Sequence, residues 1–288
     1  SGIKVWKTKD ERNGRVRSAS FSAFTTKEPL PYVVQYLTAA EELSFYGNTN
    51  TFLLNDLDCG PYICKLTQLK RLRIGAYGLC SVHEDIKNLK KYKDMGVQYM
   101  TLCHSYDNDI CSSSSNTKDA SKGLTAYGRK VVKEMNKLGM MIDISHASEA
   151  TFWDVIKYSK DPIFASHSSV KALCDHDRNL TDDQLRALAK NGGVIQICIY
   201  DGYLNNDAKA ASIDDIVKHI DHAVKVAGID HVGIGSDFDG GGGVLGCNGD
   251  NDMINITVKL LEKGYSEEDI RKIWGGNFFR VLDQVINK

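Results

Sequence analysis

Three histidines and one aspartate stand directly after short apolar runs that are typical of buried strands. They are His104, His146, His167 and Asp237. In parallel α/β folds the carboxyl ends of neighbouring strands meet at one edge, so these side chains are expected to gather there. Neutral imidazole nitrogens and carboxylate oxygens are the ligands that zinc and similar cations take. The repetition therefore predicts a metal site, although a single histidine at a strand end is more often a hydrogen-bonded structural residue.

Four other histidines give weaker signals and are interpreted as structural. His219 and His222 share a predicted helix that looks solvated, His83 stands at a helix start, and His176 lies in a predicted loop.

The elements that would position these residues alternate between strands and helices. Short β-branched runs are followed by amphipathic patterns, which is typical of βα units and a parallel sheet. Seven core strands are expected over residues 16–24, 72–76, 97–102, 141–144, 163–165, 194–199 and 232–235, with a peripheral one over 51–54. Helices are expected over residues 84–95, 128–138, 148–158, 181–190, 213–226, 252–263, 266–274 and 277–286, with a capping box from Thr181 to Gln184.

This pattern predicts a TIM-type (β/α)8 barrel that forms one domain over residues 1–288 and lacks its first strand. A peripheral segment, either residues 3–6 or a partner chain, is expected to cover the resulting gap, because open strands expose unpaired backbone groups. A doubly wound open sheet is the alternative. It usually carries a glycine-rich nucleotide turn after the first strand, and the sequence Ser22-Ala23-Phe24-Thr25 is no such turn.

Composition excludes some classes of partner. The 36 basic and 37 acidic residues nearly balance, which gives no electrostatic case for nucleic acid or an anionic membrane surface. No apolar run has the length of a spanning helix and no signal segment leads the chain, so a soluble protein is expected. Because residue 1 is Ser, it stays open whether a signal peptide has been removed from the chain. The compartment is therefore not assigned: the protein is cytoplasmic, or it is secreted or periplasmic after removal of a signal peptide. The eight cysteines form no Cys-x-x-Cys pair, so mostly free buried thiols are expected, with one or two disulfides as the alternative.

From about Lys91 to its C-terminus the chain resembles the renal or membrane dipeptidase family of zinc peptidases, in its bacterial form. Six stretches carry the resemblance, and the match before them is fainter. They are residues 96–104, 141–148 (MIDISHAS), 163–180 (IFASHSSVKALCDHDRNL), 191–197 (NGGVIQI), 230–240 (DHVGIGSDFDG) and 275–282 (GGNFFRVL).

The resemblance implies a role for each candidate residue. His146 and His167 match the two histidines of one zinc site in a two-zinc centre. His104 matches the histidine that contacts the substrate and the tetrahedral intermediate, and Arg178 the arginine that pairs with the substrate carboxylate. Asp237 matches the acid that takes a proton from the zinc-bound water and passes it to the leaving amine.

Two departures from the family pattern make this metal site incomplete. No histidine precedes His83, so the first-strand His-x-Asp is absent. Tyr77 stands where the family has the glutamate that bridges the two metals, and a phenol with a pKa of about 10 is a poor bridge. One zinc ion, held by His146 and His167 with help from Asp237, is therefore expected. A replacement thiolate from Cys80 or Cys103 is an alternative.

Three functions stay open at this point. The first is a dipeptidase-type metallohydrolase whose activity is reduced or lost. The second is a pseudoenzyme that binds dipeptides or amino acids through Arg178 and His104 without cleaving them. The third is a barrel with non-hydrolytic chemistry in which Tyr77 acts as acid or base. A dipeptide or amino acid is the expected ligand in the first two, and a homodimer stays open.

Overall fold

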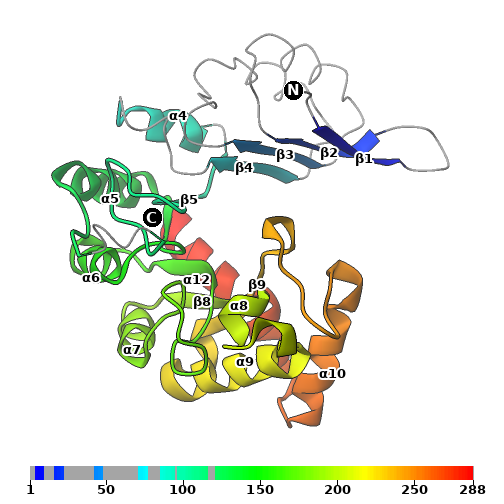
Figure 1. Cartoon of the computed structure of the whole chain (residues 1–288). Helices are drawn as coiled ribbons and strands as arrows, with labels where there is room; N and C mark the ends of the chain where they lie inside the picture. The colour runs from blue at the N-terminus through cyan, green and yellow to red at the C-terminus, as the bar shows by residue number, and fades with distance from the viewer. Residues whose placement is uncertain are drawn as a thin grey trace. The chain divides into compact units, whose positions relative to one another are not determined.

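The computed structural model describes residues 4–9, 16–22, 42–47, 71–76, 85–94, 96–115 and 121–287 (Figure 1). The chain divides into two units, Ser1–Met95 and Gly96–Lys288. Each unit is described by itself below, and a single domain over the whole chain stays a prediction.

The first unit contains a four-stranded sheet with the strand order β1-β2-β3-β4. Its elements are β1 (Lys4–Lys9), β2 (Val16–Ser22), β3 (Glu42–Gly47), β4 (Arg71–Ala76) and α4 (Asn88–Asp94). Strand β1 pairs with β2 in antiparallel orientation, whereas β2, β3 and β4 are parallel. The N-terminal segment thus pairs along one edge of β2, the first of the predicted core strands.

Strand β3 was not predicted, so the expected count of seven core strands was one too low. Its sequence, ELSFYG, contains no β-branched residue and therefore lacks the signal by which the other strands were found. The peripheral strand expected over residues 51–54 lies outside the described residues.

The second unit is built on a five-stranded parallel sheet whose strands follow chain order. The strands are β5 (Tyr99–Thr101), β6 (Met141–Asp143), β7 (Phe164–Ser168), β8 (Val194–Cys198) and β9 (Val232–Ser236). Each overlaps a strand predicted from the sequence. The described residues therefore form two hydrogen-bonded sheets of the predicted α/β class.

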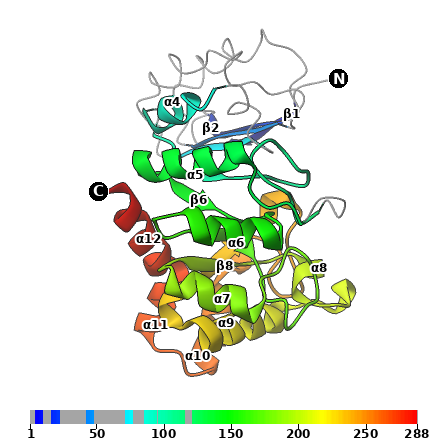
Figure 2. The same cartoon turned by 90° about the vertical axis from the view of Figure 1, so that its left-hand side faces the viewer.

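Helices connect the strands of the second unit and cover its sheet (Figure 2). They are α5 (Ala126–Leu138), α6 (Glu149–Tyr158), α7 (Asp182–Lys190), α8 (Asp201–Leu204), α9 (Ile213–Ala227), α10 (Ile254–Glu262), α11 (Glu267–Arg271) and α12 (Asn277–Ile286). A π-helical turn, Lys272–Gly276, joins α11 to α12. The capping box between Thr181 and Gln184 is present, as predicted. None of the helices in the described ranges combines the length and the hydropathy that crossing a bilayer requires.

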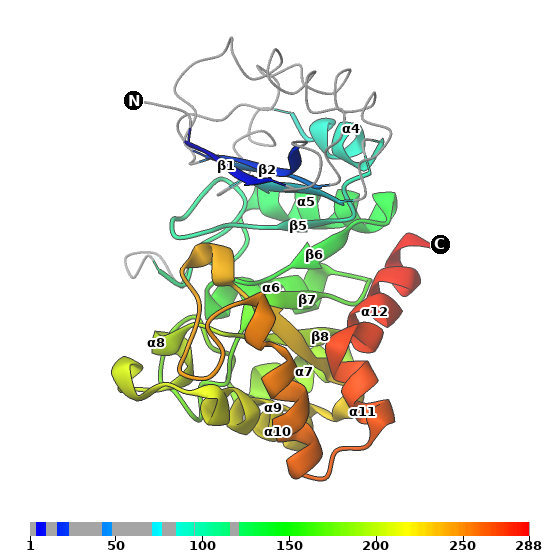
Figure 3. The same ribbon diagram turned by 90° about the vertical axis from the view of Figure 1, so that its right-hand side faces the viewer.

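The C-terminal helix α12 packs against the amino ends of the strands (Figure 3). Its residues Val281 and Val285 form one buried cluster with the first residues of three strands, which are Met141, Phe164 and Val194. Apolar packing thus closes this end of the sheet. The opposite end, where the strands finish, carries the polar side chains.

The helix α9 is less solvated than its sequence suggested. His219 is buried, with 1% of its surface exposed. Its Nδ1 accepts a hydrogen bond from the Val170 amide at 3.0 Å, and its Nε2 lies 2.9 Å from the Leu204 carbonyl. The residue is structural, as predicted, but it belongs to the interior.

Candidate active site

Three of the predicted histidines meet at the carboxyl end of the sheet. The His146 ring lies between the other two, with ring centroids 3.9 Å from His104 and 4.9 Å from His167. The Nε2 atoms of His146 and His167 face each other at 2.9 Å. The Nδ1 atom of His104 lies 2.9 Å from the Ser105 hydroxyl. Side chains from three strand ends are therefore brought to one place.

The backbone at this end of the sheet is strained. In the described ranges, His146, Ser236 and Asp237 are the non-glycine residues with positive φ, at 69°, 56° and 91°. The His146 carbonyl is fixed in this conformation by a hydrogen bond from the Ser114 amide at 2.8 Å. Such strain concentrates at functional sites, because surrounding contacts must hold it in place.

The His167 ring is oriented from the side opposite to His146. Its Nδ1 lies 2.7 Å from the Ser166 hydroxyl, and that hydroxyl donates to Asp143 Oδ2 at 2.6 Å. Asp143 is fully buried. A carboxyl group therefore supports His167 through one intervening serine.

Burial keeps all three imidazoles neutral near neutral pH. Desolvation, assisted by the positive charge of Arg178, lowers the pKa of His104 to about 4 and that of His167 to about 3. The same two causes, in the same order, hold the pKa of His146 far below its usual range. Neutral imidazole is the form that binds a metal ion.

Arg178 is buried next to His167, with 4% of its surface exposed. Its Nη2 donates to the His167 carbonyl at 2.9 Å, and its guanidinium carbon lies 5.3 Å from the centre of the Tyr203 ring. Its Nε is buried and has no hydrogen-bond partner among the described residues. The guanidinium is therefore a buried cation with unused donor capacity.

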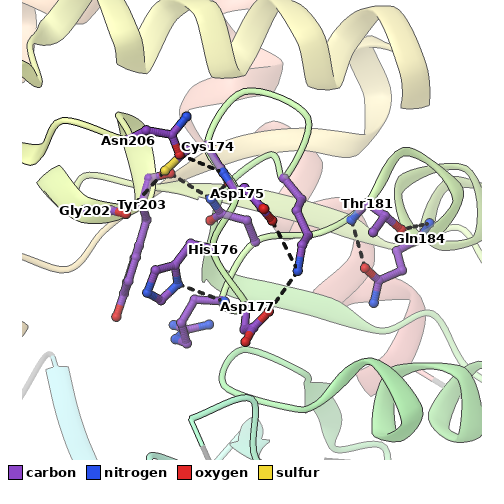
Figure 4. Close-up of polar contacts among 12 residues, drawn as sticks. Cys174, Asp175, His176, Asp177, Thr181, Gln184, Gly202, Tyr203 and Asn206 are labelled. Carbon is purple, nitrogen blue, oxygen red and sulfur yellow. Dashed lines mark hydrogen bonds and ion pairs between the residues drawn. The ribbon is translucent and has the colours of Figure 1, made fainter. Parts of the chain in front are cut away.

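A simpler interpretation is that Arg178 is a solvated charge paired with Asp175 or Asp177. The contacts in the loop between β7 and α7 exclude it. Both aspartates pair instead with Lys171, at 3.7 and 2.9 Å (Figure 4). His176, in the same loop, packs its ring against Tyr203 with centroids 4.6 Å apart. The loop thus turns Arg178 into the interior and leaves its acidic neighbours outside.

Asp237 follows β9 at the same end of the sheet and is half-buried. The Cys198 thiol donates to its Oδ2 at 3.7 Å. Burial raises the pKa of Asp237 to about 6, against the opposing effect of Arg178. A carboxyl group whose pKa lies near the working pH is suited to taking up and releasing a proton.

Among the described residues, His146 and His167 are the predicted metal ligands that the structure brings together. Two neutral histidines present their Nε2 atoms to each other, which is how two ligands of one ion converge. Within the described residues, no group of three or more His, Cys, Asp or Glu side chains could hold a metal ion. The thiol of Cys103 faces the carbonyls of Ser112 and His146, at 3.8 and 3.6 Å. Tyr77 and Cys80 lie outside the described residues.

The thiols of the described residues are free, as predicted. Cys103, Cys111, Cys174, Cys198 and Cys247 are all buried and form no disulfide. Cys59, Cys64 and Cys80 lie outside the described residues.

Asp143 and Ser166 were not identified from the sequence. The available signal was an acidic side chain in the otherwise apolar strand Met141–Ile144. Burying an aspartate there costs free energy unless its carboxylate is hydrogen-bonded, so an aspartate in this strand indicates a buried hydrogen-bond network.

Curated relatives of this chain include proteins named as dipeptidases. An uncharacterized dipeptidase of Schizosaccharomyces pombe is 39% identical over 215 residues, which cover 73% of this chain and 52% of that protein. The dipeptidase aclJ of Aspergillus oryzae is 38% identical over 214 residues, covering 74% of this chain and 51% of the relative. The chain thus spans about half the length of these curated relatives.

Solved structures share the fold. The probable dipeptidase PvdM from Pseudomonas aeruginosa is 28% identical with a TM-score of 0.72, over 79% of this chain and 72% of that chain. A metallo peptidase from Rhodobacter sphaeroides, solved with a phosphinate mimic of the dipeptide L-Ala-D-Ala, is 26% identical with a TM-score of 0.69, over 77% and 66%. These likenesses confirm the predicted α/β barrel class. The family model of membrane dipeptidases matches residues 60–288, and the chain belongs to the membrane dipeptidase family, peptidase family M19.

Proposed function

We propose that this chain hydrolyses the peptide bond of dipeptides in a metal-dependent reaction, more slowly than complete members of its family. The observation that carries the proposal is the pair of Nε2 atoms of His146 and His167, 2.9 Å apart, beside a buried arginine. Zinc is the proposed metal, because two neutral imidazoles are ligands that it favours.

His146 and His167 would hold the ion. A zinc ion bound there would lower the pKa of its water and polarise the carbonyl of the scissile bond. The two strand ends keep these ligands in place, because β6 and β7 are neighbours in one sheet.

The remaining residues act on the substrate. Arg178 is proposed to bind the C-terminal carboxylate of the dipeptide through its Nε, which has no partner among the residues that the structure describes, because a buried guanidinium gains most from an anionic partner. His104, stacked beside His146, would contact the oxygen of the tetrahedral intermediate. Asp237 would accept the proton of the attacking water and give it to the leaving amine, a task suited to its raised pKa.

A reduced rate is proposed because Tyr77 stands where the family pattern has the glutamate that bridges the two metal ions. The loss of one major electrostatic stabiliser typically lowers turnover by about 10²–10³-fold.

A binding protein without hydrolytic activity is the second candidate. The specific observation in its favour is that the described residues hold fewer than the three protein ligands usual at catalytic zinc sites. Arg178 and His104 require no metal to bind a dipeptide, so ligand binding would persist without cleavage.

The deciding experiment is an assay of L-Ala-D-Ala cleavage by the purified chain with added zinc, with chelator, and with His167→Ala as a matched variant. We expect slow cleavage that chelator and the variant both abolish. Dipeptide binding without any cleavage under saturating zinc would overturn the hydrolase proposal in favour of the binding protein.

A further inference from the structure

We propose that Asp143 and Ser166 are positioning residues that place the proton of His167 on Nδ1 and so keep its Nε2 ready to bind metal. This inference rests on the proposed metal site. It concerns how that site is prepared, and neither residue is required to touch the metal or the substrate.

The carboxylate of Asp143 accepts four hydrogen bonds. Its side chain is fully buried. Oδ1 accepts the amides of Ser145 and Ser166, at 3.0 and 2.9 Å. Oδ2 accepts the hydroxyls of Thr101 and Ser166, both at 2.6 Å. Because backbone amides can only donate, Asp143 acts as an acceptor in this network.

The hydroxyl of Ser166 links Asp143 to His167 and determines which nitrogen of His167 carries the proton. A serine hydroxyl has one hydrogen, and Ser166 gives it to Asp143. At its contact of 2.7 Å with His167 Nδ1, the Ser166 oxygen must therefore accept, so Nδ1 carries the proton. The other nitrogen of neutral His167, Nε2, is left with its lone pair facing His146.

His146 has no such support, and this makes the two ligands unequal. With the proton of His167 on Nδ1, His146 Nε2–H is the donor in the 2.9 Å contact with His167 Nε2. The Nδ1 of His146 is buried and has no hydrogen-bond partner within the described residues. To hold a metal ion through Nε2, His146 would need the tautomer with its proton on Nδ1, whereas His167 would keep the tautomer it already has.

Asp143 also joins the two ligand-bearing segments mechanically. It lies at the end of β6, and its donors come from β5, from the turn leading to His146, and from Ser166 beside His167. The His167 amide adds a further link by donating to the Ser145 hydroxyl at 2.9 Å. One buried carboxyl thus fixes the spacing of both histidines.

The tautomer of His167 is the direct test, and ¹⁵N-detected NMR of the metal-free protein with labelled histidine measures it. We expect the Nδ1–H form in the wild type, a shift toward the Nε2–H form in Ser166→Ala, and recovery in Ser166→Thr, which keeps the hydroxyl. Ser169→Ala is the matched control, because Ser169 is buried near His167 but donates to the Cys198 carbonyl. An Nε2–H wild type, or no change in Ser166→Ala, would overturn the proposal.

Zinc affinity, measured by competition with a chromophoric chelator, tests the consequence. Loss of such outer support typically weakens metal binding by roughly 10- to 100-fold, so Ser166→Ala should show that loss while Ser169→Ala does not. Equal affinities in the wild type and Ser166→Ala would overturn the positioning role. A wild type that binds no zinc would contradict the proposed function instead, and the tautomer measurement would still decide the Ser166 assignment.

Discussion

The Nε2 atom of His146 lies 2.9 Å from the Nε2 atom of His167, although 21 positions separate the two residues in the chain. The contact follows from topology, since each histidine stands at the carboxyl end of its strand and β6 pairs with β7. It also depends on local backbone, because His146 adopts a φ of 69° to bring its ring there.

Replacing Arg178 should weaken the binding of dipeptides by about ten-fold or more. A buried charge-assisted contact contributes roughly 1.5–3 kcal/mol, and Arg178→Ala removes it. Calorimetric titration of wild type and variant with a dipeptide measures the loss. Lys171→Ala is the control, because Lys171 pairs with Asp177 in the same loop.

A dipeptide amide separates the carboxylate contact from general damage to the site. Lacking the carboxylate, it should bind wild type and Arg178→Ala with similar affinity. An equal loss for the acid and the amide would show that Arg178 does not recognise the carboxylate.

Gly235→Ala should disturb the site through the backbone next to His167. A Cβ at position 235 would come within 2.2 Å of the Ser166 carbonyl oxygen and 3.0 Å of His167 Cα. We expect a loss of about 1–3 kcal/mol in the free energy of unfolding, as for other overpacked sites, and weaker zinc binding. Chemical denaturation and chelator competition measure the two effects.

The matched control is Gly249→Ala. Gly249 has extended backbone, and a Cβ there would meet nothing within 4 Å. If both variants match the wild type in stability and zinc affinity, then β9 does not pack as closely against Ser166 and His167 as these distances indicate.

Stability should fall between about pH 6.5 and pH 4, in part because of His219. Burial lowers its pKa to about 4, against smaller opposing effects of the Leu204 carbonyl and Asp215, with His222 and Lys218 adding to the lowering. The unfolded chain, with a histidine pKa of about 6.5, therefore binds more protons in this window. The contribution is fully present above pH 6.5, is lost as pH falls through 4, and amounts to about 3 kcal/mol.

Denaturation of the metal-free protein at a series of pH values, with His219→Gln beside wild type, measures this contribution. The variant should show a shallower loss of stability across the window, since the other histidines remain. An identical slope in both proteins would mean that His219 titrates alike in the folded and unfolded chains.

The sequence was most informative where apolar periodicity and β-branched residues coincide. All five strands of the second unit were predicted to within a few residues, and so were the helices between them except the short α8, which the sequence analysis did not identify. Strand β3 was missed because it contains no β-branched residue, although Phe45 and Tyr46 do favour strands.

For the site, residue type at strand ends predicted the candidates, but not how they are held. Because the carboxyl ends of neighbouring parallel strands meet at one edge, the sequence predicted that His104, His146 and His167 lie close together. It did not indicate the positive φ of His146 and Asp237, because neither is glycine and local sequence does not specify such strain. The role of Arg178 could be stated only by resemblance, since its burial depends on how the whole loop folds.

We expect His146 and His167 together to hold one zinc ion, and zinc content by elemental analysis after dialysis tests this most directly. His222→Ala serves as control, because its ring lies at 2.7 Å from Asp182, away from the cluster. We expect one tightly bound zinc per chain in the wild type and in the control, and its loss in His146→Ala and His167→Ala. Two tightly bound zinc ions per chain, no bound zinc in the wild type, or one ion that survives His167→Ala would contradict this assignment.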